Sequence, residues 1–150
     1  MELITEADDR RYYVHYLNAA PSNFLKFAGQ PFVVLVYTDR DNFSQERLHA
    51  LARYLIECNA RYVVCAGDAS ERTHDIFDEI ISHGHWDQKR GEAILTTWHA
   101  KETPEEIVFH FVNAAHPERS IPKIGLLLFD HADATAHRFV ACIRKTPAQE

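Results

Sequence analysis

The sequence of 150 residues carries a formal net charge of −6, with 46% hydrophobic and 25% charged residues. These values predict one globular domain, and the acidic balance argues against a nucleic-acid partner or an anionic membrane surface. With 5 glycines and 6 prolines the chain is not of low complexity, and no apolar run approaches the roughly 20 residues that span a bilayer.

The first 30 residues differ from the rest of the chain. Residues 10–17 are rich in aromatic and charged side chains without a helical period, and a Gly-Gln-Pro sequence at 29–31 breaks the chain. We therefore expect an N-terminal arm, residues 1–30, packed on a single α/β domain of residues 31–146. Residues 147–150 are expected to form a disordered tail.

Two buried strands with a helix between them are expected after the arm. Residues 32–37 form a continuous apolar run rich in β-branched side chains, as in strands that are buried on both faces. A capping sequence at residues 42–45 precedes apolar residues at helical spacing up to Ile56. A second apolar run at residues 62–66 predicts the next buried strand.

The alternation of helices and strands continues to residue 129. Apolar residues at helical spacing predict a helix that ends at Gly84, and residues 93–98 predict a third strand. Thr-Pro-Glu-Glu at residues 103–106 indicates the start of another helix, because Thr is a common N-cap, Pro suits the first turn, and the second Glu can reach back to the cap. Residues 124–129 predict a fourth buried strand.

We interpret residues 139–143 as the last strand. Only about eight residues separate it from the fourth strand, and a parallel crossover needs a dozen or more, so we expect this strand to be antiparallel. The predicted fold is a three-layer, Rossmann-like α/β sandwich with a mostly parallel, five-stranded sheet. Numbered from residue 32, the expected strand order is 2-1-3-4-5, with the antiparallel strand at the edge.

This strand order places a ligand site between the first and third strands. In open α/β sheets, ligands bind beyond the carboxyl ends of the strands, where the strand order reverses. Polar residues follow each parallel strand at this edge, so we expect their side chains to form one cluster. The candidate binding residues are Asp39, Arg40 and Asp41 after the first strand, Asp68 after the second, Thr97, Trp98 and His99 at the third, and Asp130 and His131 after the fourth.

Three interpretations of this cluster remain open. Asp39, Asp41 and Asp130 offer hard oxygen ligands for Mg²⁺, as in a metal-dependent phosphohydrolase or nuclease. The Asp-x-Asp spacing is that of haloacid-dehalogenase-type phosphatases, but their further Lys and paired Asp have no counterpart here. Alternatively, the aspartates cap the turns and helices that follow the strands. The third interpretation is a binding surface for a protein partner or a small ligand, centred on Trp98 and His99.

Trp98 allows two interpretations of its own. An aromatic side chain at the end of a strand can lie at the edge of the sheet, within reach of solvent and of a partner. It can also cover the core beneath the N-terminal arm, shielded by Tyr12, Tyr13 or Tyr16.

Several common catalytic signatures are missing from the sequence. It contains no Gly-x-Gly-x-x-Gly sequence or P-loop for a nucleotide and no Gly-x-Ser-x-Gly nucleophile elbow. His83 and His85 have no further ligands at a metal-site spacing. We therefore expect no metal and no cofactor, with Mg²⁺ as the alternative. The sequence favours a binding or regulatory domain, such as an immunity-like or accessory protein, over an enzyme.

The cysteines and the N-terminus indicate where the chain acts. Cys58, Cys65 and Cys142 make an odd count, and the last two lie in apolar runs, where a reduced, buried thiol is common. The acidic N-terminus lacks the layout of a signal peptide. We expect a protein of the bacterial cytoplasm.

One part of the sequence resembles a known family. The string Thr-Thr-Trp-His at residues 96–99 is followed by Glu-Glu-Ile-Val-Phe-His-Phe-Val-Asn-Ala-Ala-His-Pro at 105–117. Together with Pro-Phe-Val-Val-Leu at 31–35 and Tyr-Val-Val-x-Ala-Gly-Asp at 62–68, these residues resemble a family of small bacterial proteins with a domain of unknown function. The resemblance covers residues 31–129 and implies no activity, cofactor or catalytic residue. It supports the end of the third strand as the place of a site.

Overall fold

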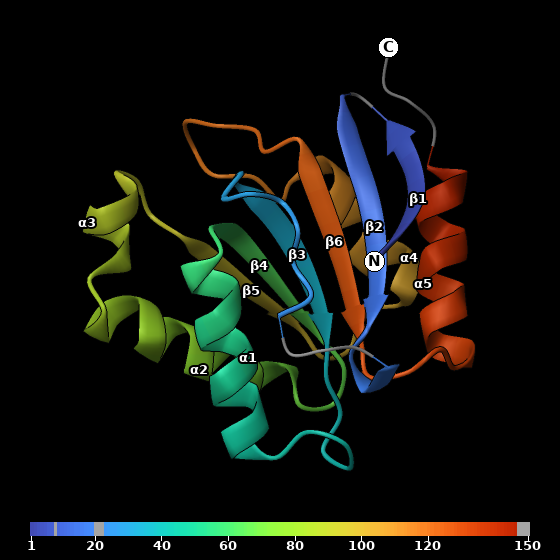
Figure 1. The fold of residues 1–150 in the computed structure, drawn as a ribbon. Helices are drawn as coiled ribbons and strands as arrows, with labels where there is room; N and C mark the ends of the chain where they lie inside the picture. The colour runs from blue at the N-terminus through green and yellow to red at the C-terminus, as the bar shows by residue number, and fades with distance from the viewer. Residues whose placement is uncertain (8, 20–22, 147–150) are drawn as a thin grey trace.

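The computed structural model describes residues 1–7, 9–19 and 23–146, so the expected tail at 147–150 lies outside the described residues. Six strands form one sheet, and helices cover both of its faces (Figure 1). This is the expected three-layer, Rossmann-like α/β sandwich. The strands are β1 (Glu2–Ala7), β2 (Arg10–Tyr16), β3 (Phe32–Tyr37), β4 (Ala60–Ala66), β5 (Leu95–His99) and β6 (Ile124–Phe129), and the helices are α1 (Gln45–Glu57), α2 (Ser70–His83), α3 (Trp86–Arg90), α4 (Pro104–Asn113) and α5 (Ala134–Lys145).

Two apolar cores hold the sheet between its helical layers. Strands β3, β4 and β6 are buried on both faces, as their continuous apolar sequences predict. Val34, Val63 and Leu126 pack with α1 and α2 on one face, whereas Leu35 and Leu127 pack with α4 and α5 on the other. Alternate residues of each strand thus enter opposite cores.

The order of the strands differs from the expected order 2-1-3-4-5. The observed order is β1-β2-β6-β3-β4-β5, so β6, and not β5, lies beside β3. All six residues of β6 are buried, whereas no residue of β5 is buried. A strand as apolar as β6 needs helices on both faces and neighbours on both sides, whereas the polar β5 is stable at the edge.

The prediction of a strand at residues 139–143 is wrong, because these residues belong to helix α5. Asp133 caps the helix by accepting a hydrogen bond of 2.8 Å from the backbone N–H of Ala136. The buried residues of α5 follow a helical period, which gives one apolar stripe against the sheet. They are Ala136, Phe139, Val140 and Ile143.

The N-terminal residues complete the sheet. Strands β1 and β2 form an antiparallel pair, and β2 runs parallel to β6 with Tyr12 opposite Gly125. Residues 2–7 and 10–16 of the expected arm are therefore part of the sheet itself. The segment after residue 22 covers the α1 face of β2 and β6, where Phe24 stacks on His15 with ring centroids 4.1 Å apart.

The expected start of α4 is confirmed. Thr103 Oγ1 accepts a hydrogen bond of 3.2 Å from the backbone N–H of Glu106. In return, the Glu106 carboxylate accepts one of 3.3 Å from the backbone N–H of Thr103. This reciprocal pair is the capping box that the sequence indicates, with Pro104 in the first turn. None of the helices in the described residues is long and apolar enough to cross a membrane.

Candidate functional site

The strand order reverses between β3 and β6, not between β3 and β5 as expected. From β3 the chain continues through β4 to the edge at β5, then returns through α4 to β6 on the other side. Of the candidate residues, Asp39, Arg40, Asp41, Asp130 and His131 follow the two strands at this reversal, and Asp68, after β4, contacts Arg40. Trp98 and His99 lie two strands away from β3.

An ion pair joins Arg47 of α1 to Asp130, which follows β6. The Asp130 carboxylate accepts a hydrogen bond of 2.5 Å from Arg47 Nη2 and lies 3.1 Å from His131 Nδ1. Burial acts to raise the pKa of Asp130, but the hydrogen bonds from Arg47 and His131 outweigh it and hold the pKa below its ordinary value. Arg47 also donates to the Asn42 carbonyl over 2.6 Å and lies over the ring of Phe43. These contacts tie α1 to the end of β6.

Asp39, after β3, and Asp68, after β4, accept hydrogen bonds from nearby backbone N–H groups. Asp39 accepts hydrogen bonds from the backbone N–H of Asn42 over 2.8 Å and from its side-chain amide over 3.0 Å. Asp68 accepts one of 2.8 Å from the backbone N–H of Arg40. Asp41 is exposed. In the described part of the chain, no three His, Cys, Asp or Glu side chains are grouped so that they could hold a metal ion.

An open hollow of about 660 Å³ lies at the ends of β3, β4 and β5. Arg40 and Arg72 line it together with Asp68 and Asp75. Glu71 adds a third carboxylate to this lining, so charges of both signs surround the space, with carboxylates in slight excess.

Trp98 and His99 lie on opposite faces of the sheet, as neighbouring residues of a strand must. Trp98 faces α2, where its ring centroid lies 4.6 Å from that of His74. Thr96, on the same face, donates a hydrogen bond of 2.5 Å to Asp78. Trp98 is 46% exposed, and β1 and β2 lie at the far end of the sheet. The interpretation that the N-terminal tyrosines cover Trp98 is therefore wrong.

Polar and ring contacts join the other face of β5 to α4. His99 Nε2 lies 3.0 Å from Thr97 Oγ1, and His99 Nδ1 lies 3.4 Å from a Glu102 carboxylate oxygen. The ring of His99 also contacts that of His110, with centroids 4.8 Å apart. His110 Nε2 in turn lies 3.2 Å from the hydroxyl of Tyr62 on β4. Five polar side chains thus form one network beside an open hollow of about 500 Å³.

The network contains two residues that the sequence analysis did not select, His110 and Tyr62. Burial lowers the pKa of His110, and the neighbouring His99 lowers it further. Burial raises the pKa of Tyr62, and a hydrogen bond with Thr97 partly offsets this. His110 follows an apolar position on α4, and Tyr62 begins an apolar run on β4, so only the packing of α4 on the sheet reveals their relation to His99.

The β5 edge combines this network with exposed apolar side chains. Leu95 and Trp98 of β5 are 38% and 46% exposed, and Phe109 of α4 is 68% exposed. Phe109 lines the same hollow as His99 and His110. Aromatic side chains surrounded by polar groups are typical of interaction surfaces.

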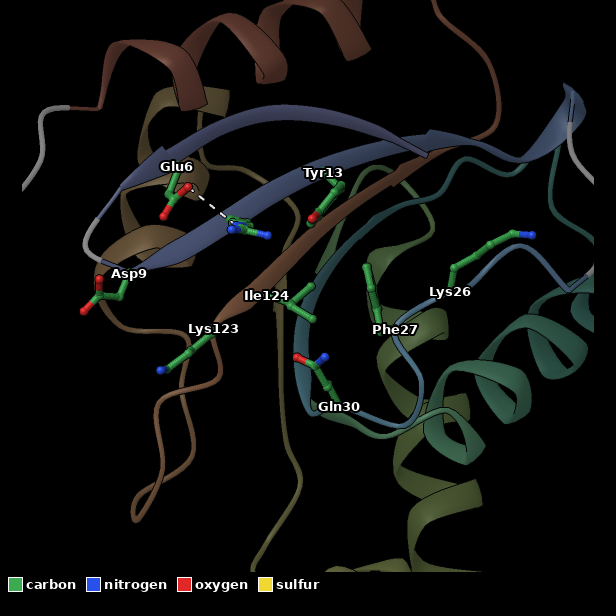
Figure 2. A pocket seen from close by; sticks show the side chains of 9 residues that line it. Glu6, Asp9, Tyr13, Lys26, Phe27, Gln30, Lys123 and Ile124 are labelled. Carbon is green, nitrogen blue, oxygen red and sulfur yellow. Dashed lines mark ion pairs between the residues drawn. The ribbon is translucent and has the colours of Figure 1, made fainter.

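A third hollow, of about 480 Å³, lies near the start of β6 and is shown in Figure 2. Glu6 and Asp9 contribute negative charges, and Arg11, Lys26 and Lys123 contribute positive ones. Glu6 and Arg11 form an ion pair of 3.5 Å, drawn as a dashed line in Figure 2, and both side chains are more than half exposed. This mixed, solvated lining points to no ligand class.

Comparisons with known proteins agree with the fold. A family model described as Domain of unknown function (DUF7684) matches residues 12–146. No curated protein matches the sequence. The crystal structure of a murein peptide ligase from Psychrobacter arcticus 273-4 is similar, with a TM-score of 0.56 and 10% sequence identity. The similarity covers 99% of this chain but 30% of the ligase chain. At this identity the likeness shows a shared fold alone.

Proposed function

The chain belongs to the family described as Domain of unknown function (DUF7684), and from this premise we propose that it is a binding domain that holds a protein partner at the β5 edge. The observation that carries the proposal is the exposure of Trp98 and Leu95 on an edge strand, with the exposed Phe109 of α4 on the face opposite to Trp98. Exposed aromatic anchors at the centre of a polar rim supply much of the energy of protein interfaces.

The two edges of the sheet differ in a way that supports this proposal. Strand β1 carries Glu2 and Glu6, and its register is irregular between Leu3 and Thr5. Charges and bulges of this kind discourage pairing with another chain. Strand β5, with the sequence Leu-Thr-Thr-Trp-His, contains no carboxylate, lysine or proline and has a regular register with β4. The β5 edge is therefore suited to a partner, and the β1 edge is protected from one.

The alternative of a metal-dependent phosphohydrolase or nuclease has less support. It needs Asp39, Asp41 and Asp130 to converge on one cation. In the structure, Asn42 holds Asp39 and Arg47 holds Asp130, each by short hydrogen bonds. These contacts favour a structural role for both carboxylates.

The bacterial cytoplasm is part of the proposal. The three cysteines are free, and burial raises the pKa of the Cys65 thiol far above its ordinary value. A reducing compartment suits such thiols.

Photocrosslinking in the host cell tests the proposed function. A photoreactive phenylalanine analogue replaces Trp98 in one variant and Leu3 in a control variant, because Leu3 is similarly exposed, at 51%, on the opposite edge. We expect light-dependent adducts with one protein from position 98 and none with that protein from position 3. The crosslinked protein is then purified and its binding to the unmodified chain measured. No adduct at position 98, or the same adduct at both positions, contradicts the proposal.

A further inference from the structure

We propose that the partner presents a basic, extended segment that pairs with β5 as a seventh strand of the sheet. This inference rests on the proposed function and names the chemistry of the partner. Addition of a peptide strand to an open sheet edge is a common mode of recognition, in which main-chain hydrogen bonds supply affinity and side chains supply specificity.

The position of β5 leaves one side of its backbone for such pairing. It lies at the end of the strand order and pairs only with β4 within the described residues, from Leu95 opposite Tyr62 to His99 opposite Ala66. All five of its residues are partly or fully exposed. A strand added here extends a parallel register that is already regular.

Side chains of an added strand would meet both faces of the sheet. Thr96 and Trp98 contact Asp78 and His74 of α2. On the other face, His99 contacts His110 of α4. Because side chains of the neighbouring strand alternate in the same way, successive residues of a partner segment would lie beside α2 and beside α4.

Both of these faces present carboxylates. On the α2 side, the side chains of Asp75 and Asp78 are 71% and 51% exposed. On the α4 side, Glu102 is 41% exposed and lines the hollow beside His99 together with Glu106. Lysine or arginine at successive positions of the partner would therefore find a negative charge on either side.

The exposed aromatic rings favour the same partner. Trp98 on one face and Phe109 on the other offer their rings near these carboxylates. An arginine guanidinium can stack on an aromatic ring while it pairs with a carboxylate. The same charges disfavour pairing of β5 with β5 of a second copy, because two edges lined by carboxylates repel each other.

Synthetic ten-residue peptides test the inference on the intact protein. The basic peptide carries arginines at four successive central positions flanked by valines, so that arginines point to both faces of the sheet. The acidic peptide carries glutamates at the same positions, and a third peptide is the basic one with two central prolines. Amide hydrogen exchange reports where each peptide binds. We expect only the basic peptide without proline to bind, and to slow exchange at residues 95–99 with no change at β1. The proline peptide should not bind, because proline removes the N–H donors that strand pairing needs.

Charge variants on one helix refine the test. We expect Asp75→Asn to weaken binding of the basic peptide about fivefold, as the loss of one favourable surface ion pair predicts. Glu79→Gln is the matched control, because Glu79 is 56% exposed on the same helix but lies beside His83, away from β5. Its affinity for the basic peptide should equal that of the parent protein.

The outcomes separate the inference from the proposed function. If position 98 crosslinks a partner but the acidic or the proline peptide binds as well as the basic one, the inference is wrong and the proposed function stands. Protection at β1 instead of β5, or equal losses in Asp75→Asn and Glu79→Gln, also overturns the inference. Absence of crosslinks at position 98 contradicts the proposed function itself.

Discussion

The imidazole rings of His99 and His110 lie 4.8 Å apart, although the two residues belong to different elements of the fold. His99 ends β5, and His110 lies in the last turn of α4. His110 also contacts Tyr62 on the neighbouring strand β4, and His99 contacts Glu102 at the surface. A ring contact, hydrogen bonds and an ion-pair contact thereby connect the exposed edge to the neighbouring strand.

Stability should decrease as the pH falls below about 6.5. Burial and the N-terminal charge lower the pKa of His15, and burial and His99 lower that of His110. In this pH range the unfolded chain takes up protons that the folded chain does not bind, so protonation favours unfolding. Urea denaturation at pH 7.5, 6.5 and 5.5 measures the effect.

Two variants assign this pH dependence to particular residues. His15→Phe keeps a ring that can stack on Phe24 and should make the free energy of unfolding depend less on pH. His83→Gln, at a side chain that is 77% exposed, is the control and should leave the dependence unchanged. A parent protein that is equally stable at all three pH values would contradict the prediction.

Thr103→Ala should destabilise the protein by about 1 kcal/mol, because it removes the capping box of α4. Thr103→Ser keeps the hydroxyl that accepts from Glu106 and should stay close to the parent. Chemical denaturation of the three proteins compares their free energies of unfolding. Equal midpoints for the alanine variant and the parent would show that the cap contributes nothing.

Trp98→Ala should cost about 1 kcal/mol, well below the roughly 3–5 kcal/mol lost when a buried aromatic residue is truncated. The reason is that nearly half of the Trp98 side chain is already in water and its described ring contact is with His74. Phe77→Ala, at a residue that is 1% exposed, provides the buried comparison. A loss above about 3 kcal/mol for Trp98→Ala would assign Trp98 to the core and remove the main support for a binding edge.

Millimolar Mg²⁺ or Mn²⁺ should leave the melting temperature unchanged. A cation that binds the folded state must raise its stability by mass action. We expect no rise because Asn42 and Arg47 hold the carboxylates of Asp39 and Asp130. Thermal denaturation with and without the cations provides the measurement. A saturable rise that disappears in Asp39→Asn would support the phosphohydrolase alternative.

Gly67→Ala should destabilise the protein by about 3 kcal/mol. Gly67 has a φ of +96°, and a Cβ placed there would lie 2.1 Å from the Thr38 carbonyl oxygen. Gly91→Ala is the matched control, because Gly91 has a φ of +79° but no atom within 4 Å of the added carbon, and it should cost about 1 kcal/mol. Similar losses at the two sites would show that the close approach at Thr38 relaxes easily.

Local signals in the sequence predicted the elements that depend on local interactions. The apolar runs at residues 32–37 and 124–129 are buried strands, and Thr103 caps α4 as expected. Residues 139–143 show the limit of this approach. Taken alone, their apolar run predicts a strand, whereas Asp133 and the helical spacing of the apolar residues indicate α5.

The sequence by itself determined the α/β class and the alternation of helices with buried strands. Only the tertiary structure decided that β5 lies at the edge, that Trp98 and His99 occupy opposite faces, and that His110 and Tyr62 join His99. The physical reason is that capping and periodicity act within a few residues along the chain. The neighbours of a strand, by contrast, depend on how much apolar surface each strand must bury against every other element of the fold.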